Sequence, residues 1–180
     1  AEKVFEENYI DKGSTLNLLN NDRPNVIILI LESFTNKIIE PLGGLKGITP
    51  NFTQFAKQGV LFRNCYATGD RTDKGIISVL NGYPGHPKLA IVNFPKKMES
   101  LPYLSSDLKK IGYYTGFVFG YNPDYANFRA YVNNSGYEKF VSKADFKASE
   151  CNAKWGVHDH IVLNRLFDEC NQAKTPFFMA

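Results

Sequence analysis

Asn25-Val26-Ile27-Ile28-Leu29-Ile30-Leu31-Glu32-Ser33 is the stretch on which the expected fold depends. It contains six consecutive apolar residues, most of them β-branched, and Pro24 directly before it cannot continue a helix. The run is too short to span a membrane. An apolar run without polar alternation is typical of a parallel strand that is covered on both faces. We therefore expect Val26–Leu31 to form a central parallel strand.

The composition indicates one ordinary globular domain. The chain has 180 residues, of which 43% are hydrophobic and 22% are charged, and its net charge is +3. Lysine and arginine are spread along the chain, which argues against a nucleic-acid partner. The three cysteines share no metal-type spacing, and because their number is odd at least one is unpaired within the chain: Cys65, Cys151 and Cys170.

The pattern of apolar and turn-forming segments predicts a three-layer α/β domain with a mostly parallel sheet. Helices are expected after residues 49, 75, 100, 126 and 159. Further strands are expected at Val60–Ala67, Tyr113–Tyr121, Tyr137–Val141 and Pro176–Ala180.

Residues 1–22 are interpreted as a polar lead-in segment with one short helix near Lys3–Tyr9, and residues 23–180 as the domain. An α/β domain is not expected to end inside a strand, as the segment from Pro176 does. The sequence therefore predicts that the C-terminal part of the domain is missing.

Glu32 and Thr72 are the residues most suited to chemistry. Each follows an apolar run that is predicted to be a strand, and the carboxyl ends of parallel strands form the ligand-binding edge of a sheet. Thr72 also lies near the start of a helix, where free N–H groups favour phosphate or sulfate. Glu32 can be a metal ligand or a helix-capping group, and Thr72 can be a nucleophile or an N-cap.

Several motifs resemble those of the lipoteichoic acid synthases, which are phosphoglycerol transferases of the alkaline phosphatase and sulfatase superfamily. The similarity extends over about residues 23–180, and the order of the motifs is more specific than any one of them. The matching segments are 25–34, Ile48-Thr49-Pro50-Asn51-Phe52, 59–62, Asp70-Arg71-Thr72-Asp73-Lys74-Gly75, Asn81-Gly82-Tyr83-Pro84, 120–129 and Trp155-Gly156-Val157-His158-Asp159.

The resemblance implies an alkaline phosphatase-like fold and a metal-dependent enzyme. Glu32 and Thr72 would bind a divalent metal, Mn²⁺ or Mg²⁺ with Zn²⁺ as an alternative, and Thr72 would attack phosphorus. The remaining family ligands, an Asp-His pair, and a substrate-binding histidine would lie beyond Ala180. We therefore expect residues 1–180 alone to lack transferase activity and a tight metal site.

The same resemblance assigns Asn127 and Arg129 to recognition of the phosphoglycerol head group, although residues 122–126 depart from several family members. Arg71 can hold a phosphate oxygen or be a surface cation. Trp155, the only tryptophan, can pack in the core or form a wall of the site.

Two other features argue against a metal ion held by a histidine pair and against the cysteine-derived aldehyde of sulfatases. His158 and His160 are two positions apart, which on a helix directs them to different sides and argues against a shared ion. Cys65 is followed by Tyr-Ala-Thr-Gly, so the Cys-x-Pro-x-Arg motif of sulfatases is absent there. Asp70 and Asp73 flank Thr72 and are expected to point away from its target.

We expect transfer of a phosphoglycerol or related group from a phosphatidylglycerol-like lipid, through a phospho-threonine intermediate. The enzyme would act at the extracytoplasmic face of a bacterial membrane, attached through segments absent from this chain, which would itself be a soluble fragment. A metal-dependent phosphatase, phosphodiesterase or sulfatase-like hydrolase is one alternative. A non-catalytic binding module with the same fold is the other.

Overall fold

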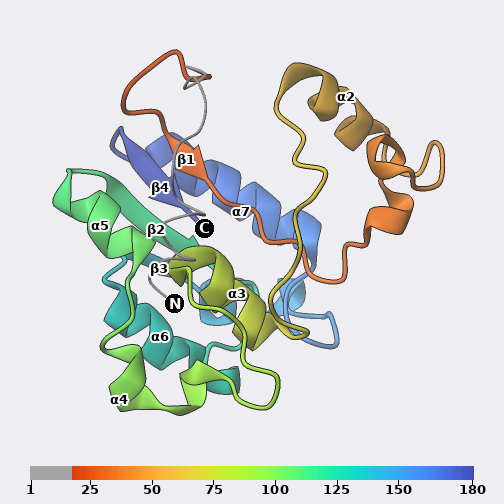
Figure 1. Ribbon diagram of the computed structural model, residues 1–180. Helices are drawn as coiled ribbons and strands as arrows, with labels where there is room; N and C mark the ends of the chain where they lie inside the picture. Colours follow the sequence, from red (N-terminus) through yellow and green to blue (C-terminus); the bar gives the residue numbers. More distant parts are fainter. Residues whose placement is uncertain (1–17) are drawn as a thin grey trace, which may run out of the picture.

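A computed structural model describes residues 18–180, and it confirms an α/β fold built on a parallel sheet (Figure 1). The predicted helix at Lys3–Tyr9 and most of the lead-in segment lie outside the described residues. Four strands pair in parallel in the order β1-β4-β2-β3. Their bounds are Val26–Ile27 for β1, Tyr114–Val118 for β2, Lys139–Val141 for β3 and Phe177–Met179 for β4.

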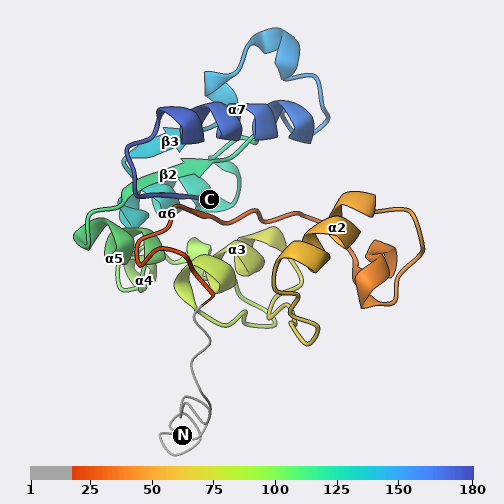
Figure 2. The same ribbon diagram turned by 90° about the horizontal axis from the view of Figure 1, so that it is seen from above.

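Helices cover the two faces of the sheet and produce the predicted three layers (Figure 2). Helix α7, Asp159–Gln172, lies on one face. The opposite face carries α3, Thr72–Asn81, α5, Leu104–Lys110, and α6, Phe128–Ser135. The shorter helices are α4, Pro95–Met98, and the 3-10 turns η3, Ile91–Asn93, η4, Tyr125–Asn127, η5, Lys143–Asp145, and η6, Ala148–Glu150.

The central strand β4 divides the core into two clusters. Phe178 is fully buried and faces the larger cluster with α3, α5 and α6, whereas Phe177 and Met179 face Leu166 of α7. This alternation follows from the period of two in a strand, where successive side chains point to opposite faces. The Pro176–Ala180 segment is therefore a strand, as predicted, and it is buried on both sides.

The prediction that Val26–Leu31 is the central strand is wrong. Within residues 18–180, Val26 and Ile27 alone of this run are paired as a strand, and β1 is an outer strand of the four-stranded sheet, beside β4. Val26 and Ile28 pack on the larger cluster, while Leu29, Ile30 and Leu31 are 40–54% exposed. An unbroken apolar run fits a strand with two covered faces, but it does not indicate which strand is central.

The predicted strand at Val60–Ala67 is also wrong. No backbone hydrogen bond joins this segment to a strand within residues 18–180, and Phe62 and Tyr66 are 76% and 82% exposed. The segment belongs to an excursion that leaves the sheet after β1 and returns to α3 (Figure 1). The excursion also contains η1, Asn36–Ile38, η2, Glu40–Leu42, and α2, Pro50–Gln58.

Asn81, the last residue of α3, ties three elements together in the core. The residue is 6% exposed; its side-chain amide donates to the carbonyl of Pro102 at 2.7 Å, and its Oδ1 accepts from the Tyr131 hydroxyl at 2.7 Å. Burial raises the pKa of Tyr131, which keeps the phenol neutral and able to donate. Gly82 follows in the left-handed region at φ +63°, which ends the helix.

Replacing Asn81 should therefore destabilise the fold. Asn81→Ala leaves the buried Tyr131 hydroxyl without its acceptor and removes the bond to the Pro102 carbonyl, and we expect a loss of about 2–4 kcal/mol in the free energy of unfolding. Urea denaturation followed by circular dichroism measures this loss. Asn133→Ala, at an exposed position of α6, is the matched control and should change stability by less than about 0.5 kcal/mol. Equal effects of the two substitutions would contradict the role given to Asn81.

Candidate functional site

Thr72 is the first residue of α3 and not its N-cap. The N-cap is Arg71, whose extended backbone places its carbonyl as the acceptor for the N–H groups of Lys74 and Gly75. Within residues 18–180, the Thr72 hydroxyl and the N–H groups of Thr72 and Asp73 have no hydrogen-bond partner. The capping interpretation of Thr72 is therefore wrong, and a hydroxyl and two N–H donors remain available at one helix end.

The loop before α3 is clamped to the helix by polar contacts. Lys74 Nζ is 2.8 Å from Asp70 Oδ1 and 3.1 Å from the carbonyl of Pro87. The hydrogen bond from Lys74 lowers the pKa of Asp70, so that carboxylate is engaged as an anion. Ser78 Oγ is 2.6 Å from Thr68 Oγ1 and 2.9 Å from the carbonyl of Tyr83. These contacts hold the chain that leads into Thr72.

Asp73 is the residue that the sequence interpretation missed. Its Oδ1 is buried and has no hydrogen-bond partner in the described part of the chain, although the side chain was expected to point away along the helix surface. A buried carboxylate oxygen without a partner is costly and rare in folded proteins. It is therefore an additional oxygen donor next to Thr72.

Glu32 lies beyond the carboxyl end of β1. It is exposed and makes no hydrogen bond or ion pair within residues 18–180, and it caps none of the helices there, so the capping interpretation is wrong. The chain that leaves β1 and the chain that enters α3 run to the same end of the molecule (Figures 1 and 2). No hydrogen bond joins Glu32 to Thr72, and Thr72 follows a loop and not the strand that was predicted.

The candidate donors Glu32, Thr72 and Asp73 are of the types that suit a hard divalent cation, but the structure does not gather them into a metal site within residues 18–180. Glu32 and Asp73 offer carboxylate oxygens and Thr72 a neutral one, the ligand chemistry that Mg²⁺ and Mn²⁺ prefer. No group of three or more His, Cys, Asp or Glu side chains that could hold a metal ion occurs among residues 18–180.

His158 and His160 do not point to different sides, so the spacing argument was wrong. His158 is the extended N-cap of α7 and not a helical residue, and the two rings stack with centroids 5.9 Å apart and planes at 21°. Both side chains are exposed, and no third ligand joins them in the described residues.

The predicted head-group residues have intramolecular partners. Arg129 Nε lies 2.6 Å from Asp124 Oδ1, and its Nη2 donates to Asp124 Oδ2 at 3.2 Å. This pairing lowers the pKa of Asp124 and raises that of Arg129. Asn127 Nδ2 donates to the carbonyl of Val92 at 3.2 Å. Arg71 is exposed, and its guanidinium makes no hydrogen bond within residues 18–180.

Trp155 is 64% exposed, so the core-packing interpretation of this residue is wrong. It lies in a short turn next to Gly156, which forms a bridge with Tyr121 just beyond β2. A role as a wall of the site remains a prediction.

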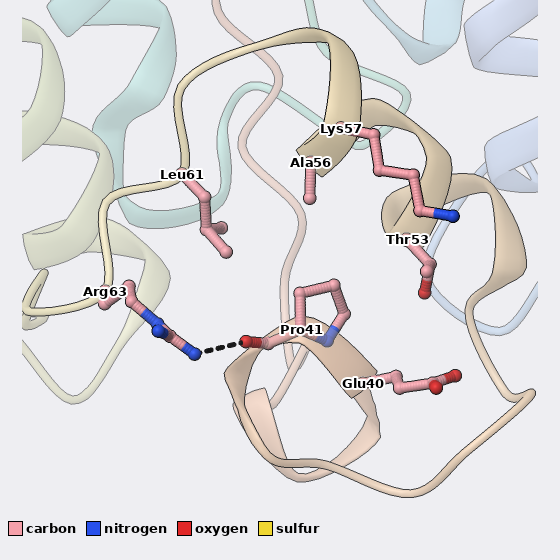
Figure 3. Close-up of a pocket in the computed structure, with 7 residues that line it drawn as sticks. All are labelled: Glu40, Pro41, Thr53, Ala56, Lys57, Leu61 and Arg63. Atoms are coloured by element: carbon pink, nitrogen blue, oxygen red, sulfur yellow. Dashed lines mark hydrogen bonds between the residues drawn. The ribbon is translucent and has the colours of Figure 1, made fainter.

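A hollow of about 560 Å³ lies away from these residues, between η2, α2 and the chain that follows α2 (Figure 3). Arg63 Nη2 donates to the carbonyl of Pro41 at 3.0 Å across it. None of the predicted site residues lines this hollow; its lining residues are Glu40, Pro41, Thr53, Ala56, Lys57, Leu61 and Arg63.

No helix among residues 18–180 is long and apolar enough to cross a membrane.

The chain is similar to known proteins in sequence and in structure. It is 28% identical over 99 residues to an N-acetylglucosamine-6-O-sulfatase from Bacteroides thetaiotaomicron, a match that covers 53% of this chain and 17% of that protein. A solved structure of a protein in the alkaline phosphatase superfamily from Vibrio parahaemolyticus superposes with a TM-score of 0.78 at 30% identity. That match covers 88% of this chain and 40% of the other.

The lipoteichoic acid synthase LtaP from Listeria monocytogenes shares the fold, with a TM-score of 0.51 at 18% identity, over 63% of this chain and 28% of that one. The present chain thus spans well under half the length of these relatives. The sulfatase family model matches residues 24–180, which is most of the chain. On this evidence the chain belongs to the sulfatase family, within an alkaline phosphatase-like fold.

Proposed function

We propose that this chain carries the nucleophile of a metal-dependent enzyme that transfers a phosphoglycerol or related phospho-group from a lipid donor. The observation that carries the proposal is the Thr72 hydroxyl, which has no partner among residues 18–180 and lies beside two N–H groups that also have none there, at the start of α3. The N-terminus of a helix stabilises an anion through these N–H groups and the helix dipole. A phosphoryl oxygen placed there would put phosphorus next to Thr72.

The chemistry then requires two displacements. Thr72 Oγ1 forms a bond to phosphorus and loses its proton, the bond from phosphorus to the lipid alcohol oxygen breaks, and the lipid alcohol takes up a proton. An acceptor hydroxyl repeats the exchange and releases Thr72, which gives ping-pong kinetics. Arg71, whose guanidinium makes no hydrogen bond in the described part of the chain, is proposed to hold a phosphate oxygen.

Glu32 and Thr72 are the proposed metal ligands, and the unpartnered Asp73 Oδ1 is a further donor next to Thr72. Bound there, Mn²⁺ or Mg²⁺, or Zn²⁺ as an alternative, would acidify a coordinated hydroxyl and offset charge on the phosphoryl oxygens. Because the donor set in this chain is partial, the remaining ligands are proposed to come from the rest of the full-length enzyme. Asn127, Arg129 and Trp155 are the proposed substrate-binding residues.

A hydrolase is the second candidate, because a curated relative is a sulfatase that acts on a sugar. Two observations favour phosphoryl transfer over sulfatase chemistry. The candidate nucleophile is a threonine, and Cys65, the cysteine nearest to it in the sequence, lacks the Cys-x-Pro-x-Arg context. A phosphatidylglycerol-like donor and action at the extracytoplasmic face of a bacterial membrane are proposed from the resemblance to lipoteichoic acid synthases. A non-catalytic module would not use the Thr72 hydroxyl as a nucleophile.

Removing the Thr72 hydroxyl tests the nucleophile. In the full-length enzyme, Thr72→Ala should lower phosphatidylglycerol turnover by at least about 10³-fold, because no group replaces the attacking oxygen. Mass spectrometry of the wild type after incubation with donor should find one glycerol phosphate on Thr72. Thr53→Ala, which removes a helical threonine hydroxyl outside the site, is the control and should retain turnover. An adduct on another residue would contradict the assignment of Thr72 as the nucleophile.

Neutralising Glu32 tests the metal site. In the full-length enzyme, Glu32→Gln should weaken Mn²⁺ binding by at least about 10-fold in calorimetry, because it keeps the size but removes the charge that a hard cation prefers. Glu99→Gln, at an exposed position after α4, should leave Mn²⁺ affinity unchanged. Residues 1–180 alone should show neither tight Mn²⁺ binding nor turnover. Tight one-to-one binding by that chain would show that the ligand assignment is wrong.

A further inference from the structure

Three aromatic side chains form an exposed group at the carboxyl end of β2. Tyr121 contacts Trp155 with ring centroids 6.3 Å apart and planes at 67°, and it contacts Tyr125 at 5.3 Å and 77°. Trp155 is 64% exposed and Tyr125 is 57% exposed. We call these three residues the aromatic corner. Aromatic side chains gathered in water are costly, and such exposed apolar groups commonly mark binding sites.

The aromatic corner is anchored to the core. Tyr121 contacts Phe119 at 6.1 Å, and Phe119 contacts the fully buried Phe128 at 5.2 Å. The turn that carries Trp155 is fixed to the same place, because the N–H of Val157 donates to the carbonyl of Gly120 at 2.9 Å. The rings are therefore held in position before any ligand arrives.

The loop that carries Tyr125 is strained and pinned. Ala126 and Asn127 are consecutive non-glycine residues in the left-handed region, at φ +50° and +57°. Such strain persists only where the surroundings enforce it, and it is concentrated at functional sites. Here the Asn127 bond to Val92 and the Arg129 pair with Asp124 enforce it.

The aromatic corner and Glu32 follow the carboxyl ends of two parallel strands of the same sheet, β2 and β1. β2 is separated from β1 by β4 alone, so the carboxyl ends of β1 and β2 are two strand spacings apart. At about 4.8 Å for each spacing, this is roughly 10 Å across the sheet. A substrate group bound at the aromatic corner could therefore belong to the molecule that reacts near Thr72 in the proposed function.

Charge restricts the ligand. Lys154 Nζ lies 5.0 Å from the centroid of the Trp155 ring, so a cation is already present there. Its charge repels a quaternary ammonium head group and favours a neutral or anionic ligand. The neutral group that fits exposed aromatic faces is a pyranose ring, whose C–H groups meet the negative ring faces while its hydroxyls reach water and polar side chains.

We propose that the aromatic corner is a binding site for a pyranose ring. This deepens the proposed function and rests on it only in assigning the sugar to the donor or the acceptor of the phospho-group.

Because Trp155 is the only tryptophan of the 180-residue chain, its fluorescence reports on the aromatic corner directly. Titration with methyl β-D-glucopyranoside should give a saturable change in emission with a midpoint in the millimolar range, and it should reduce quenching by acrylamide. Tyr125→Ala should raise the midpoint by at least about five-fold, because it removes one of the three rings. Phe167→Ala is the matched control, since Phe167 is 66% exposed and makes no ring contact with the aromatic corner.

The absence of a saturable change, or equal midpoints for the Tyr125 and Phe167 variants, would overturn the proposal. Saturation by choline in place of the sugar would also overturn it, in favour of a cation site. The Thr72→Ala chain should bind the sugar as the wild type does. Sugar binding without a phospho-threonine adduct would therefore contradict the proposed reaction and leave the sugar site standing.

Single-turnover kinetics of the full-length enzyme distinguish a pyranose carried by the donor from one carried by the acceptor. If the donor carries the pyranose, Tyr125→Ala should slow formation of the Thr72 adduct in a single turnover. If the acceptor carries it, adduct formation should be unchanged and the second displacement should slow. A Tyr125→Ala enzyme that is unchanged in both displacements would contradict a sugar site in the reacting molecule.

Discussion

The pairing of β1 with β4 is the constraint on which the rest of the structure depends. Phe178 lies opposite Val26 on one side and Thr115 of β2 on the other, so β4 joins the edge strand to the remainder of the sheet. Asn25 adds a side-chain bond, since its Oδ1 accepts from the N–H of Phe177 at 3.1 Å. Without β4, the larger cluster would lose Phe178, and α7 would lose the face against which Leu166 packs. The carboxyl edge that carries Glu32 exists only because this pairing orients β1.

Side-chain hydrogen bonds hold α3, the helix that carries Thr72, at both of its ends. Thr72 owes its place to the bonds of Lys74 and Ser78 with the preceding loop, and the far end of the same helix is fixed by Asn81 in the core. The helix that presents the hydroxyl is thus held at both ends. Such preorganisation is what a displacement at phosphorus requires, because positioning and electrostatic stabilisation supply most of the catalysis.

Much of the fold could be predicted from local patterns, and the errors have physical causes. β2, β3 and β4 follow from short apolar runs between turn residues, and the ends of α3 and α6 follow from Gly82 and Gly136. The central strand could not be identified, because Val26–Leu31 and Phe177–Met179 are both uniformly apolar and their order in the sheet is a long-range property. Val60–Ala67 has the composition of a strand but finds no partner in the described chain. In the site, Thr72 was placed within one residue of its helix position. The burial of Asp73 and the stacking of His158 on His160 depend on backbone angles at helix starts, which spacing alone does not give.

The long separation between the two strands has a consequence for how the protein is made. The bond between Asn25 and Phe177 spans 152 positions, so a ribosome that adds about 5–20 residues per second exposes the apolar run after Asn25 for roughly 8–30 s before its partner strand emerges. During that interval Val26–Leu31 is an uncharged, β-prone segment, the type of sequence that cross-pairs between nascent chains. The yield of folded protein would therefore depend on how fully a chaperone covers this segment during synthesis, independently of how stable the finished sheet is.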